Sequence, residues 1–408
     1  MNCRTLLIFV AGTLACLSQL PAAPLKTAQL LAAGKEPVRI VCIGDSITGV
    51  YYHSGGLRAY PEMLEIALKQ IHPQALVSVR NAGISGDTTA GGLKRLERDV
   101  LSHRPHLVTV MFGMNDLVGT QAVAFEKHLR EIILRCRGIG AEVVLCTQNS
   151  IYPSEKRPAA RLAEFSQIIR DVAQSESLAV ADCFATFEAV HARDTSAWNL
   201  LLSDDIHPNM AGHRLFAETI AQTITGQKTS LAGVGPPEPA LRHTRARLAE
   251  GRPIHVLAMP PYDTLITSAI QHAFPQAVMQ VTPWPTQGQT LAQIRAFAGK
   301  VRAMAPDLVL IAIPGAVPVG KMEAFHANYS WTMNLALSFG PQQWDVIVVV
   351  PSATNTQLPA EQMAHEKLAR QLIQAQDLHM IDRREGDRST TADLLTHWLA
   401  PHLRSTSR

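Results

Sequence analysis

The stretch Ile40-Val41-Cys42-Ile43-Gly44-Asp45-Ser46 decides the fold and carries the first candidate functional residue. Residues 38–43 form an apolar, β-branched run with the length of one strand, and this run stops abruptly at Gly44. Glycine permits a tight turn that a bulkier side chain would resist. We therefore predict that Ser46 lies where a sheet strand ends and a helix begins, which favours an exposed hydroxyl and a positive local field.

Strand-like and helix-like segments alternate along the first half of the chain. The predicted strands cover 38–43, 75–80, 105–112, 142–147 and 178–182, and the predicted helices cover 61–71, 88–101, 122–136, 159–173 and 211–224. This alternation favours an α/β fold, a doubly wound parallel sheet in a flavodoxin-like α/β/α sandwich. Ligands bind such sheets at the carboxyl ends of the strands, so the polar clusters that follow the strands are expected to share one rim.

The second half repeats the pattern after a Gly- and Pro-rich linker at 227–253. Strands are predicted at 254–259, 277–281, 306–313, 344–350 and 379–381, and Pro306-Asp307-Leu308-Val309 corresponds to Pro105-His106-Leu107-Val108. We interpret this as an internal duplication that gives two tandem domains of similar fold, at 36–226 and 254–403. The alternative is a Rossmann-like second domain of separate origin.

Composition and the amino terminus limit the class of protein. The chain has 408 residues, 47% hydrophobic and 17% charged, with a net charge of +3 and no basic tract that would indicate nucleic-acid binding. Arg4, the apolar run 6–17 and the small residues 21–23 are typical of a signal peptide at 1–23, which predicts export to the periplasm or the medium. A lipid anchor at Cys16 is the less favoured alternative. No other segment predicts stable membrane insertion, and no cysteine spacing indicates a metal site.

Four short blocks, each following a predicted strand or in a late loop, carry the chemistry. They are Gly44-Asp45-Ser46-Ile47, Asn81-Ala82-Gly83, Gly113-Met114-Asn115-Asp116 and Asp204-Asp205-Ile206-His207-Pro208. In this order and spacing they resemble the signature of the SGNH hydrolases, also called GDSL esterases and lipases. The resemblance covers residues 38–224.

The resemblance implies a role for each block. Ser46 would be the nucleophile, His207 its base and later the acid for the leaving alcohol, and Asp204 the group that orients the imidazole. The backbone N–H groups of Ser46 and Gly83 and the side-chain amide of Asn115 would form the oxyanion hole. No cofactor and no metal are expected.

Other interpretations of these residues stay open. Taken singly, each block is equally consistent with a helix cap or a turn, and Asp205 is a second choice for the triad acid. We expect Asp45, Asp87, Asp116 and His213 to be structural. The Gly-x-Ser-x-Gly elbow of α/β-hydrolases is absent, and so are the Asp-x-His and Gly-Asn-His segments that a metallophosphoesterase would need.

The second half departs from the signature wherever chemistry is expected. Tyr262 or its neighbours stand for Ser46, Thr282-Pro283-Trp284-Pro285 stands for the Gly83 block, and Pro314-Gly315-Ala316 stands for residues 113–115. No Asp-x-x-His occurs near the carboxyl terminus. The hypothesis is a non-catalytic copy that shapes or covers the site of the first half; the alternative is a packing partner only.

The predicted reaction is hydrolysis of a carboxylic ester through an acyl-Ser46 intermediate. Members of the family it resembles act on acetylated sugars and polysaccharides, lysophospholipids, thioesters and short acyl esters. Tyr51, Tyr52 and Arg58 lie between the first two blocks, where aromatic faces are suited to sugar rings, although an ordinary surface loop is the alternative. We favour a carbohydrate acetylesterase over a lysophospholipase or generic short-acyl esterase. A non-catalytic glycan-binding protein is the alternative from another class.

Overall fold

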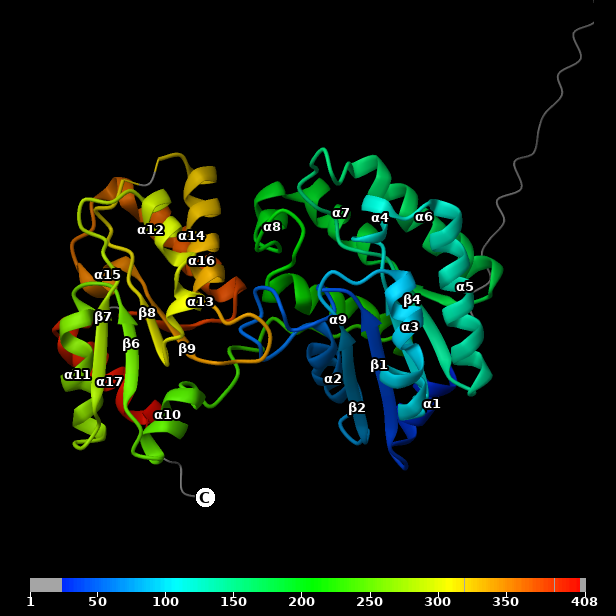
Figure 1. Cartoon of the computed structure of the whole chain (residues 1–408), viewed down its shortest axis with the longest axis horizontal. Helices are drawn as coiled ribbons and strands as arrows, with labels where there is room; N and C mark the ends of the chain where they lie inside the picture. The colour runs from blue at the N-terminus through cyan, green and yellow to red at the C-terminus, as the bar shows by residue number, and fades with distance from the viewer. Residues whose placement is uncertain (1–23, 319, 385, 404–408) are drawn as a thin grey trace, which may run out of the picture.

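Two parallel five-stranded sheets form the framework of the protein (Figure 1). The structure, a computed structural model, describes residues 24–403 apart from 319 and 385, so the predicted signal peptide and Cys16 lie outside the described residues. The first sheet has the order β2-β1-β3-β4-β5, and the second, read from β7, has the same order, β7-β6-β8-β9-β10. The predicted fold class, two tandem α/β sandwiches, is thereby confirmed.

The strands correspond closely to the apolar runs of the sequence. In the first sheet they are β1 Val38–Gly44, β2 Val77–Gly83, β3 Leu107–Met111, β4 Glu142–Cys146 and β5 Ala179–Ala181. In the second they are β6 Ile254–Ala258, β7 Met279–Pro283, β8 Leu308–Ile311, β9 Asp345–Val349 and β10 His379–Ile381. β3 is buried along its whole length and β1 at every residue except Arg39. Each Val or Ile buried in this way stabilises the fold by about 1.5–3 kcal/mol.

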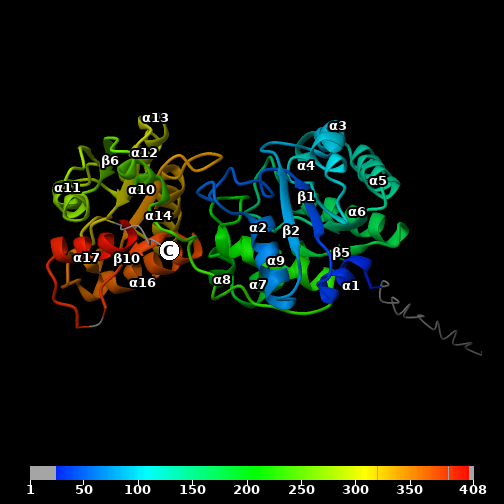
Figure 2. The ribbon, with the colours of Figure 1, turned by 90° about the horizontal axis from the view of Figure 1, so that it is seen from below.

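Helices cover both faces of the first sheet (Figure 2). One face carries α2 Tyr60–Ile71 and α9 Met210–Thr225, which pack on each other, and α1 Lys26–Ala33 lies against α9. The other face carries α3 Thr89–Asp99, α5 Ala122–Gly138 and α6 Ala159–Ser175. The remaining helical elements of this domain are α4 Asp116–Gly119, α7 Cys183–Arg193, α8 Thr195–Asn199 and the 3-10 turn Leu101–His103.

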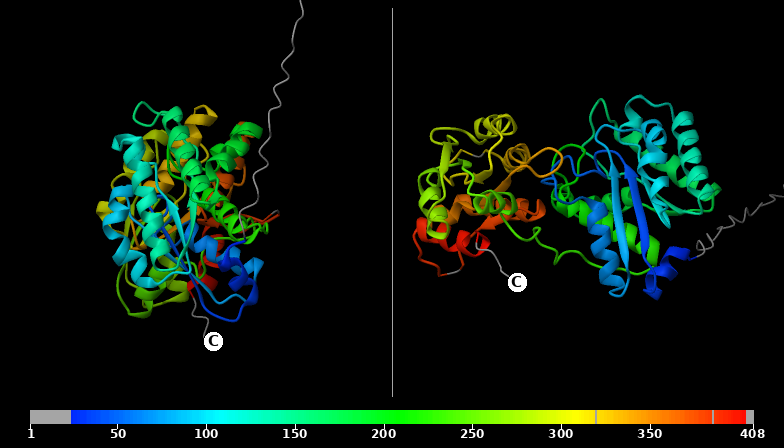
Figure 3. Two further views of the ribbon diagram at one scale, coloured as in Figure 1. Left: turned by 90° about the vertical axis from the view of Figure 1, so that its right-hand side faces the viewer. Right: turned by 60° about the horizontal axis from the view of Figure 1, so that its bottom comes forward.

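The second sheet is covered in the same manner. Its helices are α10 Arg242–Ala249, α11 Tyr262–Ala273, α12 Leu291–Ala298, α13 Val301–Met304, α14 Met322–Ala336, α15 Pro351–Thr354, α16 Met363–Ala375 and α17 Thr391–Leu403. The helical stretch at 291–304 is divided into α12 and α13 at Gly299 and Lys300. An irregular segment at 226–241 connects the two domains (Figure 3).

The two domains share details beyond their strand order. In each, an Arg of the helix before the last strand pairs with the Asp that follows that strand: Arg170 with Asp182 at 2.8 Å, and Arg370 with Asp382 at 2.7 Å. In each, the carboxylate that begins the fourth strand accepts backbone N–H groups at the start of the helix before the first strand: Glu142 for α1, and Asp345 for α10. These details favour duplication, which stays a prediction.

The domains meet through loops (Figures 1 and 3). The loop after β1 reaches the loop that follows α14, where Gly340 N–H donates to the Tyr51 carbonyl. Two arginines of the first domain, Arg58 and Arg214, pair with the buried carboxylate of Asp377 in the second. Among the described residues, no helix is long and apolar enough to span a membrane.

Candidate active site

Ser46 lies in a turn directly after β1. Gly44 is required at the strand end, because an added Cβ would lie 2.0 Å from Thr48 Oγ1 and 2.5 Å from the Met111 carbonyl oxygen. The turn is closed by the Gly49 N–H, which donates to the Asp45 carbonyl at 3.1 Å. The prediction of a helix start at Ser46 is wrong, since α2 begins only at Tyr60. The hydroxyl is also not openly exposed, since Ser46 is 7% exposed.

Ser46, His207 and Asp204 form one hydrogen-bonded chain. Ser46 Oγ lies 3.0 Å from His207 Nε2, and His207 Nδ1 lies 2.8 Å from Asp204 Oδ2. The other carboxylate oxygen, Asp204 Oδ1, accepts the backbone N–H groups of Ile206 and His207 at 2.8 and 2.6 Å. Asp205, the second choice for the acid, is exposed and has no part in this chain. The three side chains therefore meet although 158 residues separate Ser46 from Asp204 in the sequence.

The surroundings keep Asp204 ionised. Burial alone would raise the pKa of this carboxyl, but the hydrogen bonds from His207 and His53 outweigh burial and hold the pKa below its usual range. A permanent carboxylate beside Nδ1 fixes the tautomer in which Nε2 is free to accept a proton from the hydroxyl. This is the electrostatic arrangement that makes a serine hydroxyl a nucleophile.

The expected oxyanion donors lie on neighbouring strand ends. Gly83 pairs with Gly44 in the parallel register, and a Cβ at Gly83 would lie 2.2 Å from the Gly49 nitrogen. The Ser46 N–H has no hydrogen-bond partner within 24–403 as described. The Gly83 N–H, in contrast, donates to Asn81 Oδ1 at 3.0 Å, and Asn115 Nδ2 donates one hydrogen to the Asp87 carbonyl at 3.0 Å. One donor is thus free, one is engaged, and the amide of Asn115 keeps a second hydrogen.

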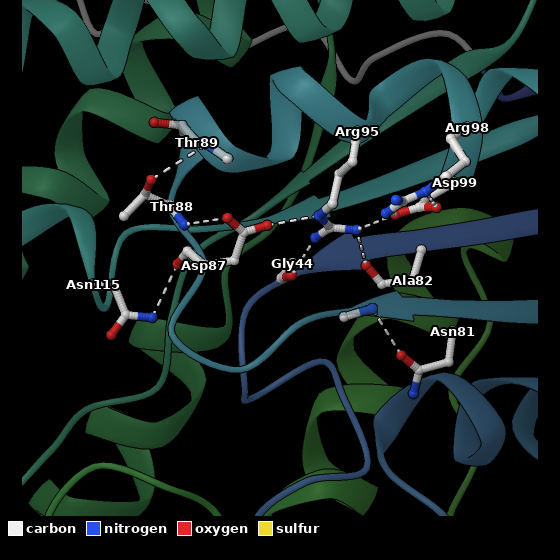
Figure 4. A network of polar contacts seen from close by, with 12 residues as sticks. Gly44, Asn81, Ala82, Asp87, Thr88, Thr89, Arg95, Arg98, Asp99 and Asn115 are labelled. Atoms are coloured by element: carbon white, nitrogen blue, oxygen red, sulfur yellow. Dashed lines mark hydrogen bonds and ion pairs between the residues drawn. The ribbon is translucent and has the colours of Figure 1, made fainter. Parts of the chain in front are cut away.

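Arg95, which the sequence analysis missed, ties these strand ends together (Figure 4). Its buried guanidinium donates to the Gly44 carbonyl at 2.9 Å, to the Ala82 carbonyl at 2.6 Å and to Asp87 Oδ2 at 2.6 Å. The Asp87 carbonyl in turn holds Asn115. One side chain therefore fixes the segments that lead to Ser46, Gly83 and Asn115. Its place on the buried face of α3, between Gly92 and Leu96, was the available signal.

The four polar residues expected to be structural all have structural contacts, and Asp87 is described above. Asp45 accepts the Ile47 N–H at 2.9 Å, and burial raises its pKa to about 7. Asp116 accepts both the backbone N–H and the hydroxyl of Thr89. His213 Nδ1 accepts the Tyr60 N–H at 3.1 Å, and burial lowers its pKa to about 3.

The three residues expected to contact substrate differ in their surroundings. The Tyr52 ring stacks on the His207 ring with centroids 4.3 Å apart, and Phe339 of the second domain lies edge-on to Tyr52 at 5.0 Å. The Tyr51 ring is tilted against Phe339 at 5.7 Å. Arg58 bonds Asp377 at 2.8 Å and the Gly235 carbonyl at 2.7 Å, so its guanidinium is used at the domain interface.

The same edge of the second sheet carries prolines. Ala258 of β6 holds the register position that Gly44 holds in β1, since each pairs with the last residue of its neighbouring second strand. Counting from the paired strands, the residues that correspond to Ser46, Gly83 and Asn115 are Pro260, Pro283 and Pro314. Proline has no N–H and offers neither a nucleophile nor an oxyanion donor.

This register narrows one expected correspondence, Tyr262 or its neighbours for Ser46, to Pro260, and it corrects another. Tyr262 does not stand at the position of Ser46: it begins α11, is fully buried, and its hydroxyl lies 3.0 Å from Thr354 Oγ1. The segment 314–316 is shifted by two residues, because Ala312 takes the position of Gly113. The sequence alone does not show these offsets, because they follow from strand pairing.

A nucleophilic hydroxyl, an imidazole and a carboxylate in this order define the geometry of a serine hydrolase. Residues 42–215 match the GDSL-like lipase/acylhydrolase family. The first domain of the chain belongs to this SGNH family and is a hydrolase domain that acts on ester bonds.

Relatives of known activity cover just under half of the chain. An acetylxylan esterase from Geobacillus stearothermophilus is 28% identical over 209 residues, which is 46% of this chain and 93% of that protein. An arylesterase from Vibrio mimicus is 29% identical over 196 residues, which is 48% of this chain and 92% of that protein. Among solved structures, a lipase/acylhydrolase from Enterococcus faecalis is 28% identical, with 47% of this chain and 98% of that chain covered and a TM-score of 0.40.

Proposed function

We propose that the protein is an exported serine esterase that hydrolyses carboxylic esters, and that its substrates are acetylated carbohydrates. The observation that carries the esterase proposal is the chain from Ser46 Oγ through His207 to Asp204, with links of 3.0 and 2.8 Å. These lengths are those of hydrogen bonds along which a proton moves between hydroxyl and imidazole.

The proposed reaction has two halves. His207 Nε2 takes the proton of Ser46 as Oγ attacks the acyl carbon, and then gives this proton to the leaving alcohol as the ester C–O bond breaks. Water loses a proton to His207, attacks the acyl-Ser46, and the acid is released as Ser46 regains its proton. In both halves Asp204 stabilises the imidazolium that forms.

The oxyanion of each tetrahedral intermediate needs donors. The free N–H of Ser46 supplies one, and the second hydrogen of the Asn115 amide supplies another. The N–H of Gly83 would join them by releasing or sharing its bond to Asn81. Each such donor is worth about 100- to 1000-fold in rate.

The surroundings of the triad support a carbohydrate substrate. Tyr51, Tyr52 and Phe339 gather beside His207, and aromatic faces suit the apolar faces of sugar rings. A cleft of about 770 Å³ between the domains is lined by Asp204, by Trp331 and by a majority of apolar groups, and it reaches the triad at Asp204 rather than at Ser46 or His207. Its volume is typical of small-molecule sites. The similarity to an acetylxylan esterase agrees with this class.

Export rests on the sequence of residues 1–23, which has the layout of a signal peptide. Expression of the full gene in a bacterial host, followed by fractionation and mass determination of the mature chain, tests it. A chain that keeps its first 23 residues in the cytoplasmic fraction would contradict export.

The esterase proposal is tested with p-nitrophenyl acetate and three proteins: wild type, Ser46→Ala and Ser102→Ala. Ser102 is exposed on the turn before β3, at the opposite end of the sheet, so its variant is the matched control. We expect loss of turnover in Ser46→Ala alone. Equal rates in all three would leave only binding, as in a glycan-binding protein. Acetylated xylan compared with lysophospholipid then decides the substrate class.

A further inference from the structure

A second histidine bonds the triad carboxylate. His53 Nε2 lies 2.8 Å from Asp204 Oδ2, the oxygen that also accepts His207 Nδ1. The imidazole is buried, 2% exposed, and burial lowers its pKa, so it is neutral and donates from Nε2. Its Nδ1 has no partner among the residues that the structure describes. Burying this unpaired nitrogen costs free energy, which indicates that the bond to Asp204 has a use.

The backbone of His53 is held in a conformation that side chains rarely adopt. Its φ is +57°, in the left-handed region, where a non-glycine residue is disfavoured by about 1–2 kcal/mol. Such outliers persist only where surrounding contacts impose them. Here the contacts come from the second domain.

Gln376, at the end of α16, makes these contacts. Its buried side chain donates from Nε2 to the His53 carbonyl, and its Oε1 accepts the Ser203 hydroxyl at 3.0 Å. Ser203 directly precedes Asp204, so one amide joins the loop of His53 to the loop of the triad acid. The edge of Trp331 also faces the His53 ring, with centroids 5.8 Å apart.

A second buried amide supports the same loop. Asn334 Nδ2, on α14, donates to the Ser203 carbonyl at 2.9 Å. Both amides come from the domain whose own sheet edge carries prolines in place of the catalytic groups. Buried hydrogen bonds of this kind hold the segments they join in one arrangement, although Asn334 Oδ1 has no partner among the described residues.

Resting on the proposed esterase function, we propose that His53 is a positioning residue of the triad and that Gln376 of the second domain holds it against Asp204. Four N–H groups then surround the carboxylate, from Ile206, His207 (backbone and ring) and His53, and leave it one orientation. The imidazole of His207 is aligned with Ser46 only while that orientation holds. The second domain is in this way a part of the catalytic machinery.

The test compares His53→Leu with His53→Gln in the full chain. Glutamine places an N–H donor near the position of Nε2, whereas leucine fills similar space without one. We expect a 10- to 100-fold lower kcat in His53→Leu with KM within about threefold, and a kcat within about threefold of wild type in His53→Gln. The melting temperature of the leucine variant should change little, because removal of the unpaired Nδ1 offsets the loss of the bond to Asp204. A wild-type kcat in His53→Leu, or equal losses of kcat and melting temperature in both variants, would overturn the proposal.

The second domain is tested through Gln376→Leu, with the exposed Gln374→Leu as its control. We expect about a tenfold lower kcat in Gln376→Leu and no change in Gln374→Leu. Combined with His53→Leu, the Gln376→Leu change should add little, because both act through one contact. If the losses of kcat in the two single variants add up in the double variant, the proposed action of Gln376 through His53 is overturned. If wild type itself shows no turnover that depends on Ser46, the proposed function fails; if it does while His53→Leu is unaffected, only this inference fails.

Discussion

Replacement of Asp204 by asparagine gives the sharpest test of the site, because the shape changes little and the hydrogen-bond pattern is reversed. Both oxygens of Asp204 are acceptors: Oδ2 accepts the rings of His207 and His53, and Oδ1 accepts the N–H groups of Ile206 and His207. An asparagine amide has one acceptor and one donor end, so in either orientation its NH₂ faces two N–H groups.

The conflict is relieved most cheaply if His207 changes tautomer. The ring then accepts at Nδ1 from the new amide and carries its hydrogen on Nε2, which faces Ser46 Oγ. Such a ring cannot take the hydroxyl proton. A reversed tautomer in a serine triad lowers kcat by about 10⁴, which corresponds to about 5.4 kcal/mol at 1.36 kcal/mol per decade.

The assay is kcat/KM for p-nitrophenyl acetate near pH 7.5, with Asp205→Asn as the matched control one residue away. Asp205 is exposed and outside the triad, so this control should stay within about twofold of wild type. A loss smaller than tenfold in Asp204→Asn would refute the assignment. A loss of kcat/KM in Asp205→Asn as large as that in Asp204→Asn would show that the effect is not specific to Asp204, and this would also refute the assignment.

The same variant has a signature in stability. The pKa of Asp204 is lower in the folded protein than its ordinary value of 3.8, so its ionised form stabilises the fold above about pH 4. That contribution is lost as the pH falls below this value towards the folded pKa. The difference in unfolding free energy between wild type and Asp204→Asn should therefore narrow on acidification, as measured by urea denaturation at several pH values.

Three further predictions concern the residues around the triad. Asp45 has a folded pKa of about 7, so the free energy of unfolding that it contributes is present below about pH 4 and is lost as the pH rises towards 7. Between pH 4 and 7.5, the unfolding free energy of Asp45→Asn should therefore gain up to about 4 kcal/mol relative to wild type in urea titrations. A difference that does not depend on pH would contradict this. Gly83→Ala should lower both folding yield and turnover, because its Cβ meets the Gly49 backbone. Gly119→Ala, with open space around it, should change neither. Equal yield and turnover in the two variants would contradict the expected crowding at Gly83. Arg95→Leu leaves Asp87, whose side chain is only 12% exposed, without its cation and should lower the unfolding free energy by about 3 kcal/mol. Arg98→Leu, at an exposed neighbour, is the control, and Arg95→Lys should rescue little, since one ammonium cannot reproduce the three-way contact.

Both sheets could be predicted from the sequence, because each strand is a β-branched apolar run and the crossovers contain helices of ordinary length. The four blocks could also be predicted, because each of them follows a strand or lies in the late loop before α9. The sequence did not show that Ser46 lies in a turn, because residues 45–59 have no periodicity that distinguishes a turn from the start of a helix. The helix α14 was not predicted, although Phe325, Tyr329 and Met333 recur at intervals of four and are buried.

The contacts that join the domains lay beyond any local pattern. His53 and Gln376 are 323 residues apart, and nothing in either neighbourhood indicates an amide bound to a histidine carbonyl. The partners of Arg58 could not be predicted from the sequence either. In the sequence it is a cation close to the candidate site, and only the fold shows that Asp377 and Gly235 occupy it. Long-range polar partners follow from topology, and composition does not reveal them.

The second domain combines prolines at its own sheet edge with buried amides that contact the first domain. A domain with Pro260, Pro283 and Pro314 at the positions of the nucleophile and the oxyanion donors cannot gain the chemistry by a single substitution, because both backbone donors are missing. Selection on this domain would then act through the residues that it contacts. Besides the pairing of Asp377 with Arg58 and Arg214, it touches the first domain at Tyr51, His53 and Ser203, which lie close to the triad. A second domain that served only as bulk would not need to place two buried amides beside the catalytic acid, each of which costs free energy unless its partners are in position.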